Sequence, residues 1–515
     1  MLKGVLTVGG WTMASRILGF ARDILIAALA GTGPVADAFF VANKLPNMFR
    51  RLFGEGAFNA AFVPEFAGLL AAEGPGAARG FAQEAISVMT FWLLLLTLLG
   101  ELFMPVMMLG LAPGFSEFPA KFALAVNLGR ITFPYLLLIC LAALLSGVLN
   151  GLDRFAAAGA SQVIYNVFSI AAMLLLTRYV PTVGHALAWG VSGAGVAQLV
   201  LLYVAVARAG MPLRIPRPRL TPQTRLLLRR MWPGLVGASA VQINSAVDVI
   251  IGSLLPPGTV SLLEYADRVN QLPLGVIGAA VGTALLPMLS RQVRSGEAAA
   301  AIETLNRGIE YALFLTLPAA LALVVSGYPI MRVLFVRGAF DVHSAALSAQ
   351  ALAAYALGLP AFVLVKVLAP AFFARGDTST PVKIGMATLA MNLVLNLALM
   401  VPLQHMGPPL ASSLAAVFNV AGLGFVLLRR KFLAFDTKLR ARLARMLFAA
   451  LVMAATLLVV QRGLFGAAEP ARGAKWVALA VLVGLGLSAY GVAGQLAGAF
   501  DLRETRRRLV RRRSA

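Results

Sequence analysis

The sequence predicts an all-α polytopic membrane protein of about fourteen transmembrane helices, with two parallel six-helix lobes around a central cationic cavity and two additional C-terminal helices. Two observations predict this class. Of the 515 residues, 60% are hydrophobic and only 13% are charged, and the mean hydropathy is +0.84, which is unlike a soluble globular protein. The apolar residues also gather in runs long enough to cross a bilayer core, which needs roughly 20 residues.

The apolar runs follow one another along the whole chain. Their expected spans are residues 5–30, 34–64, 79–110, 122–150, 157–180, 184–208, 228–255, 260–291, 300–326, 344–374, 380–401, 408–429, 443–462 and 474–499. An even number of spans places both termini on one side of the membrane. If that side is the cytoplasm, three cytoplasmic segments, 208–230, 429–445 and the tail from residue 501, carry seven Lys or Arg each. The positive-inside rule therefore predicts cytoplasmic termini.

The net charge of +23 has the same explanation. The basic residues cluster at the ends of apolar runs, which favours membrane orientation and contact with anionic phospholipids and argues against nucleic-acid binding.

The two halves of the chain resemble each other at an offset of about 225 residues. Matched positions pair Asp23 with Asp248 and Pro134 with Pro360. A segment rich in Pro and Arg, residues 210–225, separates the halves and reads as a linker. The predicted domains are an N-lobe at 1–209 (helices 1–6), a cytoplasmic linker at 210–225, a C-lobe at 226–432 (helices 7–12), helices 13 and 14 at 433–500, and a basic cytoplasmic tail at 501–515. Helices 13 and 14 either pack on the core or line an apolar groove for a lipid tail.

A charged helical hairpin, residues 15–64, stands out among these apolar runs. It carries Arg16, Arg22, Asp23, Asp37, Lys44, Arg50, Arg51 and Glu55. Each charge at bilayer depth costs about 3 to 10 kcal/mol, so such a concentration indicates a wet polar cavity. Helical spacing places Thr12, Arg16, Gly19 and Asp23 on one stripe and Asn43, Asn47, Arg50 and Gly54 on a second, and Pro46 is expected to kink the second helix. The alternative is that the arginines reach the cytoplasmic interface and only orient the protein.

The second half repeats this pattern. Glu264, Asp267, Arg268 and Gln271 share one helical face ahead of a proline. Arg268 is expected to point at the same cavity, and an ion pair with Glu264, four residues earlier, is compatible with that role. Asp248 is either a cation or proton site or a buried hydrogen-bonded carboxylate. Asp377 marks a cytoplasmic helix-helix turn, with a coupling-ion role as the less favoured alternative.

The chemistry of the cargo follows from the predicted cavity. Arginine presents a planar fork that matches phosphate oxygens, so a cavity rich in arginine predicts an anionic cargo such as a phosphate or diphosphate. The expected ligands are Arg16, Arg22, Arg50 and Arg268, and the residues expected to support the cavity are Asp23, Asp37, Asn47, Arg51, Glu55 and Gln271. The lone Cys140 excludes an intrachain disulfide, and the histidines show no ligand spacing, so we expect no metal, no cofactor and no catalytic residue.

Several long motifs carry a family resemblance: SRILGFARD, DAFFVANKLPNMFRRLFGEGAFNAAFVP, YADRVNQLP, KVLAPAFFARGDTSTPVK and APGF at residues 112–115. With them, essentially the whole chain resembles the MurJ (MviN) family of lipid II flippases, part of the multidrug, oligosaccharidyl-lipid and polysaccharide (MOP) exporter superfamily.

The resemblance implies a multi-pass protein of the bacterial cytoplasmic (inner) membrane that serves peptidoglycan and cell-wall biogenesis, and thereby cell shape. Its substrate would be lipid II, an undecaprenyl-diphosphate-linked precursor moved from the inner to the outer leaflet, with the tail in a groove of helices 13 and 14. Essential cavity arginines fall on Arg16, Arg22, Arg50 and Arg268, and an important acid falls on Asp37.

The resemblance leaves three points open. Some relatives have an acid where this chain has Gln271, so the role of an acid there is in doubt. A sodium site of some relatives uses acids matching Asp248 and Asp377, but its other ligands have no match, which leaves coupling to a monovalent cation or to the membrane potential open. Cell-wall synthesis enzymes are possible partners. The alternative functions are a cation-coupled multidrug or lipid-linked oligosaccharide exporter and a non-transporting cell-wall scaffold.

Overall fold

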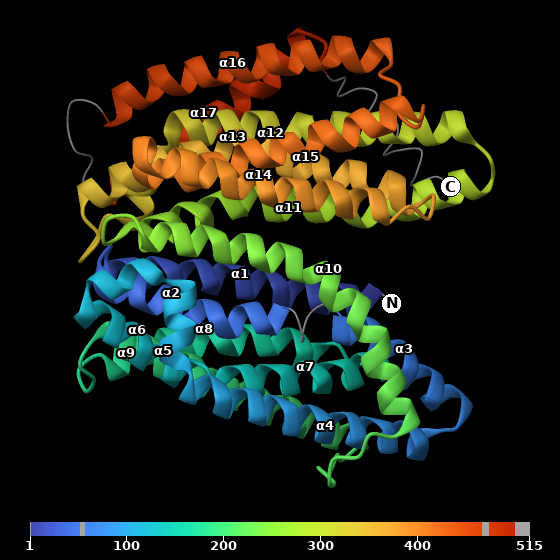
Figure 1. Cartoon of the computed structure of the whole chain (residues 1–515). Helices are drawn as coiled ribbons and strands as arrows, with labels where there is room; N and C mark the ends of the chain where they lie inside the picture. Colours follow the sequence, from blue (N-terminus) through green and yellow to red (C-terminus); the bar gives the residue numbers. More distant parts are fainter. Residues whose placement is uncertain (1, 52–56, 466–472, 500–515) are drawn as a thin grey trace. The chain divides into compact units, whose positions relative to one another are not determined.

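The computed structural model describes residues 2–51, 57–465 and 473–499. Throughout these ranges the chain is helical: seventeen α-helices and two short 3₁₀ helices follow one another, and an isolated bridge between Arg337 and Phe340 is the one β-type pairing in the described part of the chain. Figure 1 shows these helices as long rods. The predicted all-α class is confirmed.

The chain divides into two compact units. The first comprises residues 1–261 together with 337–340, and the second comprises residues 262–336 and 341–515. These packing units are a different division from the predicted repeat halves, because α10 packs with the N-terminal helices. The predicted domain boundaries stay predictions.

The first unit is built from ten complete helices and one 3₁₀ turn within the described ranges. They are α1 Leu2–Ala30, α2 Pro34–Arg50, α3 Ala57–Ala72, α4 Pro75–Leu102, α5 Met104–Leu111, η2 Pro113–Glu117, α6 Pro119–Thr132, α7 Tyr135–Gly151, α8 Ala156–Leu176, α9 Val183–Arg208 and α10 Pro222–Ser253. Within this unit α8 packs on α1 and α9, α7 packs on α9, and α2 packs on α6.

The second unit continues from α11, whose first three residues belong to the first unit. Its helices are α11 Thr259–Arg294, α12 Ala298–Phe335, α13 Val342–Phe373, α14 Ser379–Leu403, η3 Gln404–Met406, α15 Gly407–Arg429, α16 Thr437–Phe465 and α17 Ala474–Leu496. The largest helix contacts here join α12 to α13, α13 to α15 and α14 to α15.

Two predicted spans are each formed by two helices in the structure, and the sequence at each break explains why. The span 122–150 is split between α6 and α7 by Pro134, and the span 79–110 is split between α4 and α5 just before Pro105. Proline removes a backbone donor and crowds the preceding turn. The span 34–64 contains α2 and α3, and residues 52–56 between them lie outside the described residues. The two helices within the 122–150 span still count together as one candidate membrane span, residues 119–151.

Nine stretches of the described residues are long and apolar enough to cross a membrane, and two of them combine a pair of successive helices. Helices α1, α2, α10 and α11 are not among the nine. These four contain most of the charged positions that the sequence singles out, since α1 and α2 carry charges of the hairpin, α10 carries Asp248 and α11 carries Arg268. The count of fourteen spans stays a prediction.

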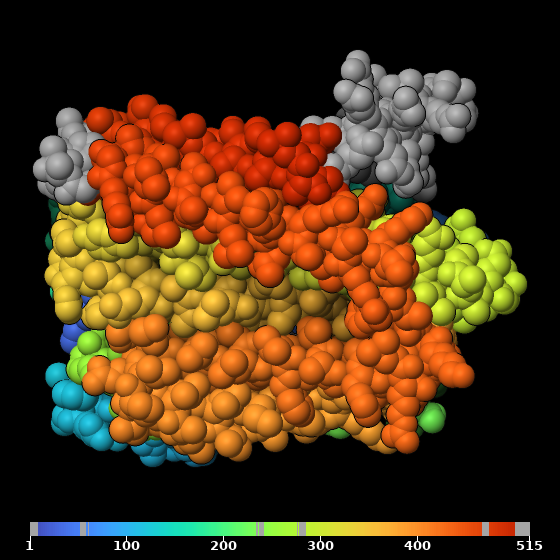
Figure 2. Space-filling view, turned by 90° about the horizontal axis from the view of Figure 1, so that it is seen from above, coloured from blue at the N-terminus to red at the C-terminus, as the bar shows by residue number. Residues whose placement is uncertain are grey.

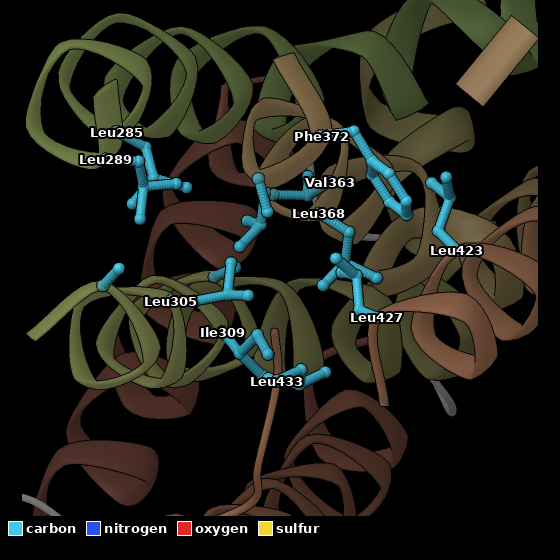
Figure 3. Packing of buried hydrophobic residues seen from close by; sticks show 14 of the residues in the cluster. Leu285, Leu289, Leu305, Ile309, Val363, Leu368, Phe372, Leu423, Leu427 and Leu433 are labelled. Carbon is cyan, nitrogen blue, oxygen red and sulfur yellow. The ribbon is translucent and has the colours of Figure 1, made fainter. Parts of the chain in front are cut away.

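The core of the second unit is an apolar cluster shared by five helices, α11, α12, α13, α15 and α16. Leu285 and Leu289 of α11 meet Leu305 of α12, and α13 and α15 add further apolar side chains, among them Phe372 and Leu427. Figure 3 shows these residues converging from separate helices. Leu289, Leu305 and Leu427 are each at most 1% exposed. Dispersion contacts across such small, well-filled interfaces hold membrane helices together.

Helices α16 and α17 pack against each other and on α12, beside which they lie in red tones in Figure 2. Met453 and Leu457 of α16 meet Leu482 of α17 in a small apolar cluster. The Tyr490 hydroxyl of α17 donates a hydrogen bond of 2.9 Å to the carbonyl of Phe314 on α12. The predicted C-terminal helix pair thus exists, and its use as a lipid-tail groove stays a prediction.

An ion-pair cluster fixes the start of α16 to α12. Glu310, 5% exposed, pairs with Arg307 on its own helix and with Arg442 of α16. Arg307 also pairs with Asp436 at 2.6 Å, and the Asp436 carboxylate accepts the Leu439 N–H in the first turn of α16. Two acids and two arginines therefore balance one another where α16 begins. An anion at a helix N-terminus is also favoured by the helix dipole.

Candidate substrate-binding site

The charged stripe of α1 contains two arginines in different surroundings. Arg16 is exposed, and within the described residues its guanidinium has no ion pair. Arg22 pairs with Asp23 at 2.8 Å, with side chains 12% and 10% exposed. Its guanidinium also lies 5.2 Å from the centre of the Tyr165 ring of α8, a favourable cation–π distance. Arg16 is accordingly available to a ligand, whereas Arg22 is held between α1 and α8.

The other side of the stripe packs on α8. The Asn166 side chain donates hydrogen bonds to the carbonyl and hydroxyl of Ser15, at 3.1 and 3.2 Å. A Cβ built on Gly19 would lie 3.5 Å from the Asn166 oxygen, an ordinary contact. The predicted stripe is therefore divided, because Gly19 faces a neighbouring helix while Arg16 remains exposed.

On α2 the predicted second stripe forms a chain of polar contacts. The Asn47 amide donates to the carbonyl of Asn43 at 2.8 Å, and Arg50 Nε donates to the Asn47 side-chain oxygen at 3.3 Å. Asn47 thereby holds the arginine side chain along its own helix. Arg51 is exposed, and Glu55 lies outside the described residues. Pro46 lies inside α2, and the kink expected there stays a prediction.

Asp37, near the start of α2, is fully buried and bound entirely by protein donors. Its Oδ2 accepts Lys121 Nζ of α6 at 2.7 Å and the Gly258 N–H at 2.7 Å. Its Oδ1 accepts the Ser261 N–H and lies 2.8 Å from the Ser261 hydroxyl. The Asp37 carboxylate thus joins α2 and α6 to the connection that leads from α10 into α11. The amides it binds are at the N-terminus of α11, where the helix dipole favours a negative charge.

Lys121 is the residue that sequence reasoning missed. Its side chain is 5% exposed, and Nζ lies 3.8 Å from the centre of the Phe115 ring as well as on Asp37. A buried lysine needs such partners, because an isolated ammonium is costly away from water. The sequence offered one signal. Lys121 is a basic residue near the start of the apolar run 119–132, and its charge is opposite to that of Asp37, the single acid in the first turn of α2.

The APGF motif lies next to this network. Gly114 donates its N–H to the Ser253 hydroxyl at 3.3 Å, and a Cβ added to Gly114 would stand 2.1 Å from the Ser253 carbonyl oxygen. Only glycine permits the backbone of η2 to approach the end of α10 this closely. The motif, which carries part of the family resemblance, therefore packs η2 against α10.

In the second unit the polar face of α11 is organised by local pairs. Arg268 pairs with Glu264, one turn earlier, at 2.8 Å, and its side chain is 39% exposed. Gln271 donates to Asp267 at 3.2 Å. The predicted i, i+4 pair between Arg268 and Glu264 is confirmed. Whether Arg268 also meets the substrate stays a prediction.

The two candidate cation sites differ in position. Asp248 is half-buried on α10. Asp377 lies in the turn between α13 and α14, where its carboxylate accepts the Thr380 N–H at 3.0 Å and pairs with Arg430 at 2.6 Å. These contacts account for Asp377 as a turn residue, and the cation role of both acids stays a prediction. Among the residues with described positions, no cluster of three or more His, Cys, Asp or Glu is arranged to hold a metal ion.

We expect Asp377 to make the protein less stable in acid. Hydrogen bonds from Thr380, and then from Arg430, hold the pKa of the Asp377 carboxyl well below its usual range. A lowered folded-state pKa contributes stability that is complete above the ordinary pKa, about 4, and is lost as pH falls below it. Thermal unfolding in detergent between pH 6 and pH 3 should show a steeper acid loss for the parent than for Asp377→Asn. Glu73→Gln, at an exposed acid of the α3–α4 turn, is the control, and an Asp377→Asn profile as steep as the parent's would contradict the assignment.

Comparison with known proteins decides the family. A family model described as "Lipid II flippase MurJ" matches residues 26–466. The chain belongs to the MurJ family. A relative from Rhizobium meliloti strain 1021, named "Probable lipid II flippase MurJ", is 44% identical over 517 residues and covers 99% of this chain and 96% of the relative. A second relative with that name, from Rhizobium tropici, is 40% identical and covers 100% of this chain and 98% of its own length.

Solved structures agree with the MurJ assignment at the level of fold. A structure described as "Lipid II flippase MurJ, inward closed conformation" aligns with a TM-score of 0.79 at 24% identity and covers 95% of this chain and 98% of that one. An inward-facing multidrug resistance MATE family transporter of the MOP superfamily aligns with a TM-score of 0.64 at 12% identity, covering 81% of this chain and 94% of that one. With its apolar helices, this MurJ family member is a polytopic membrane protein.

Proposed function

We propose that this chain is a lipid II flippase, which moves an undecaprenyl-diphosphate-linked peptidoglycan precursor from the inner to the outer leaflet of the bacterial cytoplasmic membrane. The observation that carries the proposal is similarity over the full length to relatives named as such flippases, at 40% and 44% identity. A flippase moves a lipid without making or breaking a covalent bond, so the protein is a transporter and not an enzyme.

The diphosphate is the part of the substrate that the charged helices suit. Arg16 is exposed on α1, and Arg50 donates a hydrogen bond to the side-chain oxygen of Asn47, three residues earlier on α2. Guanidinium groups bind phosphate oxygens through two parallel hydrogen bonds, and the low dielectric of a membrane interior strengthens such contacts. We assign diphosphate binding to Arg16 and Arg50, with Arg22 as a further contact supported by Asp23. Arg268 is proposed for the same role from the sequence.

The isoprenoid tail needs an apolar surface that reaches the lipid. Phe448, Leu451 and Val459 of α16 are 58%, 52% and 70% exposed, which is an unusual surface in water and a normal one against acyl chains. We assign the tail to the helix pair α16 and α17, where it remains in contact with lipid while the headgroup crosses.

The orientation follows from charge. We place both termini in the cytoplasm, because this puts the basic segments 208–230 and 429–445 inside. The membrane potential, negative inside, then favours outward movement of the anionic headgroup by about 2.3 kcal/mol per charge per 100 mV. A monovalent cation at Asp248 or Asp377 would assist the return step. Membrane phospholipids and cell-wall synthesis enzymes are the proposed further partners.

An in-cell flipping assay tests this proposal. A strain depleted of its own flippase would express this chain, and the fraction of lipid-linked precursor exposed on the outer leaflet would be measured. We expect the parent to restore exposure to the level before depletion. Failure of an expressed, membrane-inserted parent would contradict the proposal and favour a multidrug exporter or a scaffold, which dye efflux and pull-down of cell-wall enzymes then separate.

Arg50→Ala tests the phosphate assignment in the same strain. We expect flipping to fall at least about tenfold, because one charge-assisted contact contributes about 1.5 to 3 kcal/mol. Arg219→Ala, which removes one positive charge from an exposed residue outside the charged hairpin, is the control. Full activity of the Arg50 variant would mean that this side chain only reaches the interface.

A further inference from the structure

A pocket of about 460 Å³ lies at one end of the first unit, where α7 turns into α8 beside the last two turns of α9. Its apolar wall includes Leu149, Leu201 and Val204. The size falls in the range of small-molecule sites. The pocket is at the ends of three packed helices, which Figure 1 shows side by side, and helix ends of a membrane protein lie at the level of lipid headgroups.

The charged wall of the pocket is formed by Asp153, Arg154 and Arg208. Arg154 and Arg208 are exposed, and within the described ranges neither guanidinium has an ion pair. Two unpaired arginines against one aspartate leave the pocket with a net positive charge. None of these residues belongs to the charged hairpin assigned to the diphosphate.

The turn that carries Arg154 is fixed by its backbone. The Arg154 N–H bonds to the Leu149 carbonyl at 2.8 Å and the Asp153 N–H bonds to the Asn150 carbonyl at 3.1 Å, which together form a Schellman cap on α7. Asp153 occupies the left-handed position with φ of 58°, where glycine is usual and Asn or Asp is tolerated. The cap holds Arg154 at the pocket without any side-chain partner.

We propose that this pocket binds one anionic phospholipid, with both arginines on the headgroup phosphate and an acyl chain over Leu201 and Val204. Basic pockets between membrane helices are the usual sites of acidic headgroups. An apolar wall continuous with a basic one suits a lipid better than a soluble anion. Asp153 opposes the ligand charge and sets the affinity below its maximum.

Native mass spectrometry of the purified full chain in detergent tests the proposal, with phosphatidylglycerol, phosphatidylethanolamine and inorganic phosphate as separate probes. Arg154→Gln with Arg208→Gln should weaken phosphatidylglycerol binding about 30-fold. Asp153→Asn keeps a residue that tolerates the left-handed turn and should tighten binding severalfold. The control, Arg217→Gln with Arg219→Gln, removes the same charge from exposed positions outside the pocket and should change binding by less than twofold.

Each contrary outcome is distinct. An equal loss in the control pair would show diffuse attraction to a basic surface. If phosphatidylethanolamine binds as tightly as phosphatidylglycerol, the pocket does not recognise the lipid by its negative charge. If millimolar phosphate competes with the lipid, the pocket binds a soluble anion. A lower melting temperature of the double variant without lipid would make the loss structural. In that case the Asp153→Asn variant alone tests the proposal, and an unchanged affinity of that variant for phosphatidylglycerol would overturn it.

Discussion

Replacing Asp37 with alanine is expected to lower the free energy of unfolding by about 3 to 5 kcal/mol, the usual cost of leaving a buried charge without its partner. Lys121 would remain in the protein interior without its acid, and the N–H groups of Gly258 and Ser261 would lose an acceptor. The measurement is thermal or denaturant unfolding in detergent, together with the amount of protein inserted in the membrane.

A second variant separates the charge from the packing. Asp37→Ala with Lys121→Met removes both charges, and we expect it to recover more than half of the lost stability, because apolar replacement of a complete buried pair is often close to neutral. Glu73→Ala, at an exposed acid with no ion pair in the described part of the chain, should change stability by less than about 0.5 kcal/mol. An Asp37→Ala protein as stable as this control would refute the assignment of Asp37 as a buried anchor.

Arg16→Ala is expected to abolish most flipping while the protein remains folded. Arg22→Ala is expected to reduce both the flipping activity and the stability of the fold. Arg16 is exposed, so its removal leaves no buried group unpaired. Arg22 neutralises Asp23, which is 7% exposed, and its loss should cost about 3 kcal/mol. Flipping per inserted molecule and the melting temperature, measured on the same preparations, distinguish the two effects.

Lysine substitution refines this result. Arg16→Lys keeps the charge and loses the planar fork, so activity between those of the parent and Arg16→Ala would indicate that paired hydrogen bonds to phosphate matter. Arg219→Ala, in the exposed 210–225 segment, is the control for loss of one positive charge. If Arg16→Ala flips lipid as well as Arg219→Ala, Arg16 does not bind the substrate.

The sequence by itself determined the membrane class, the helical character and most helix limits. Apolar fraction, run length and proline positions are properties of the chain that no partner alters. It also predicted the pair of Arg268 with Glu264, since residues four apart meet on any helix, and the turn at Asp377. Both are present in the structure.

Only the tertiary structure decided which charged side chains are buried against other helices. Asp37 and Lys121 are 84 residues apart, and Arg22 lies against a ring on α8. Helix periodicity predicts which polar residues share one face of a helix. It does not predict whether that face lines a cavity or packs against another helix, because the two kinds of face have the same hydropathy. In a chain this uniformly apolar, small residues and specific polar contacts choose the packing partners. Those contacts join segments that are distant in the sequence. The sequence therefore identifies Asp37 as a charged residue of the hairpin, and only the folded protein shows that it anchors the α10–α11 connection.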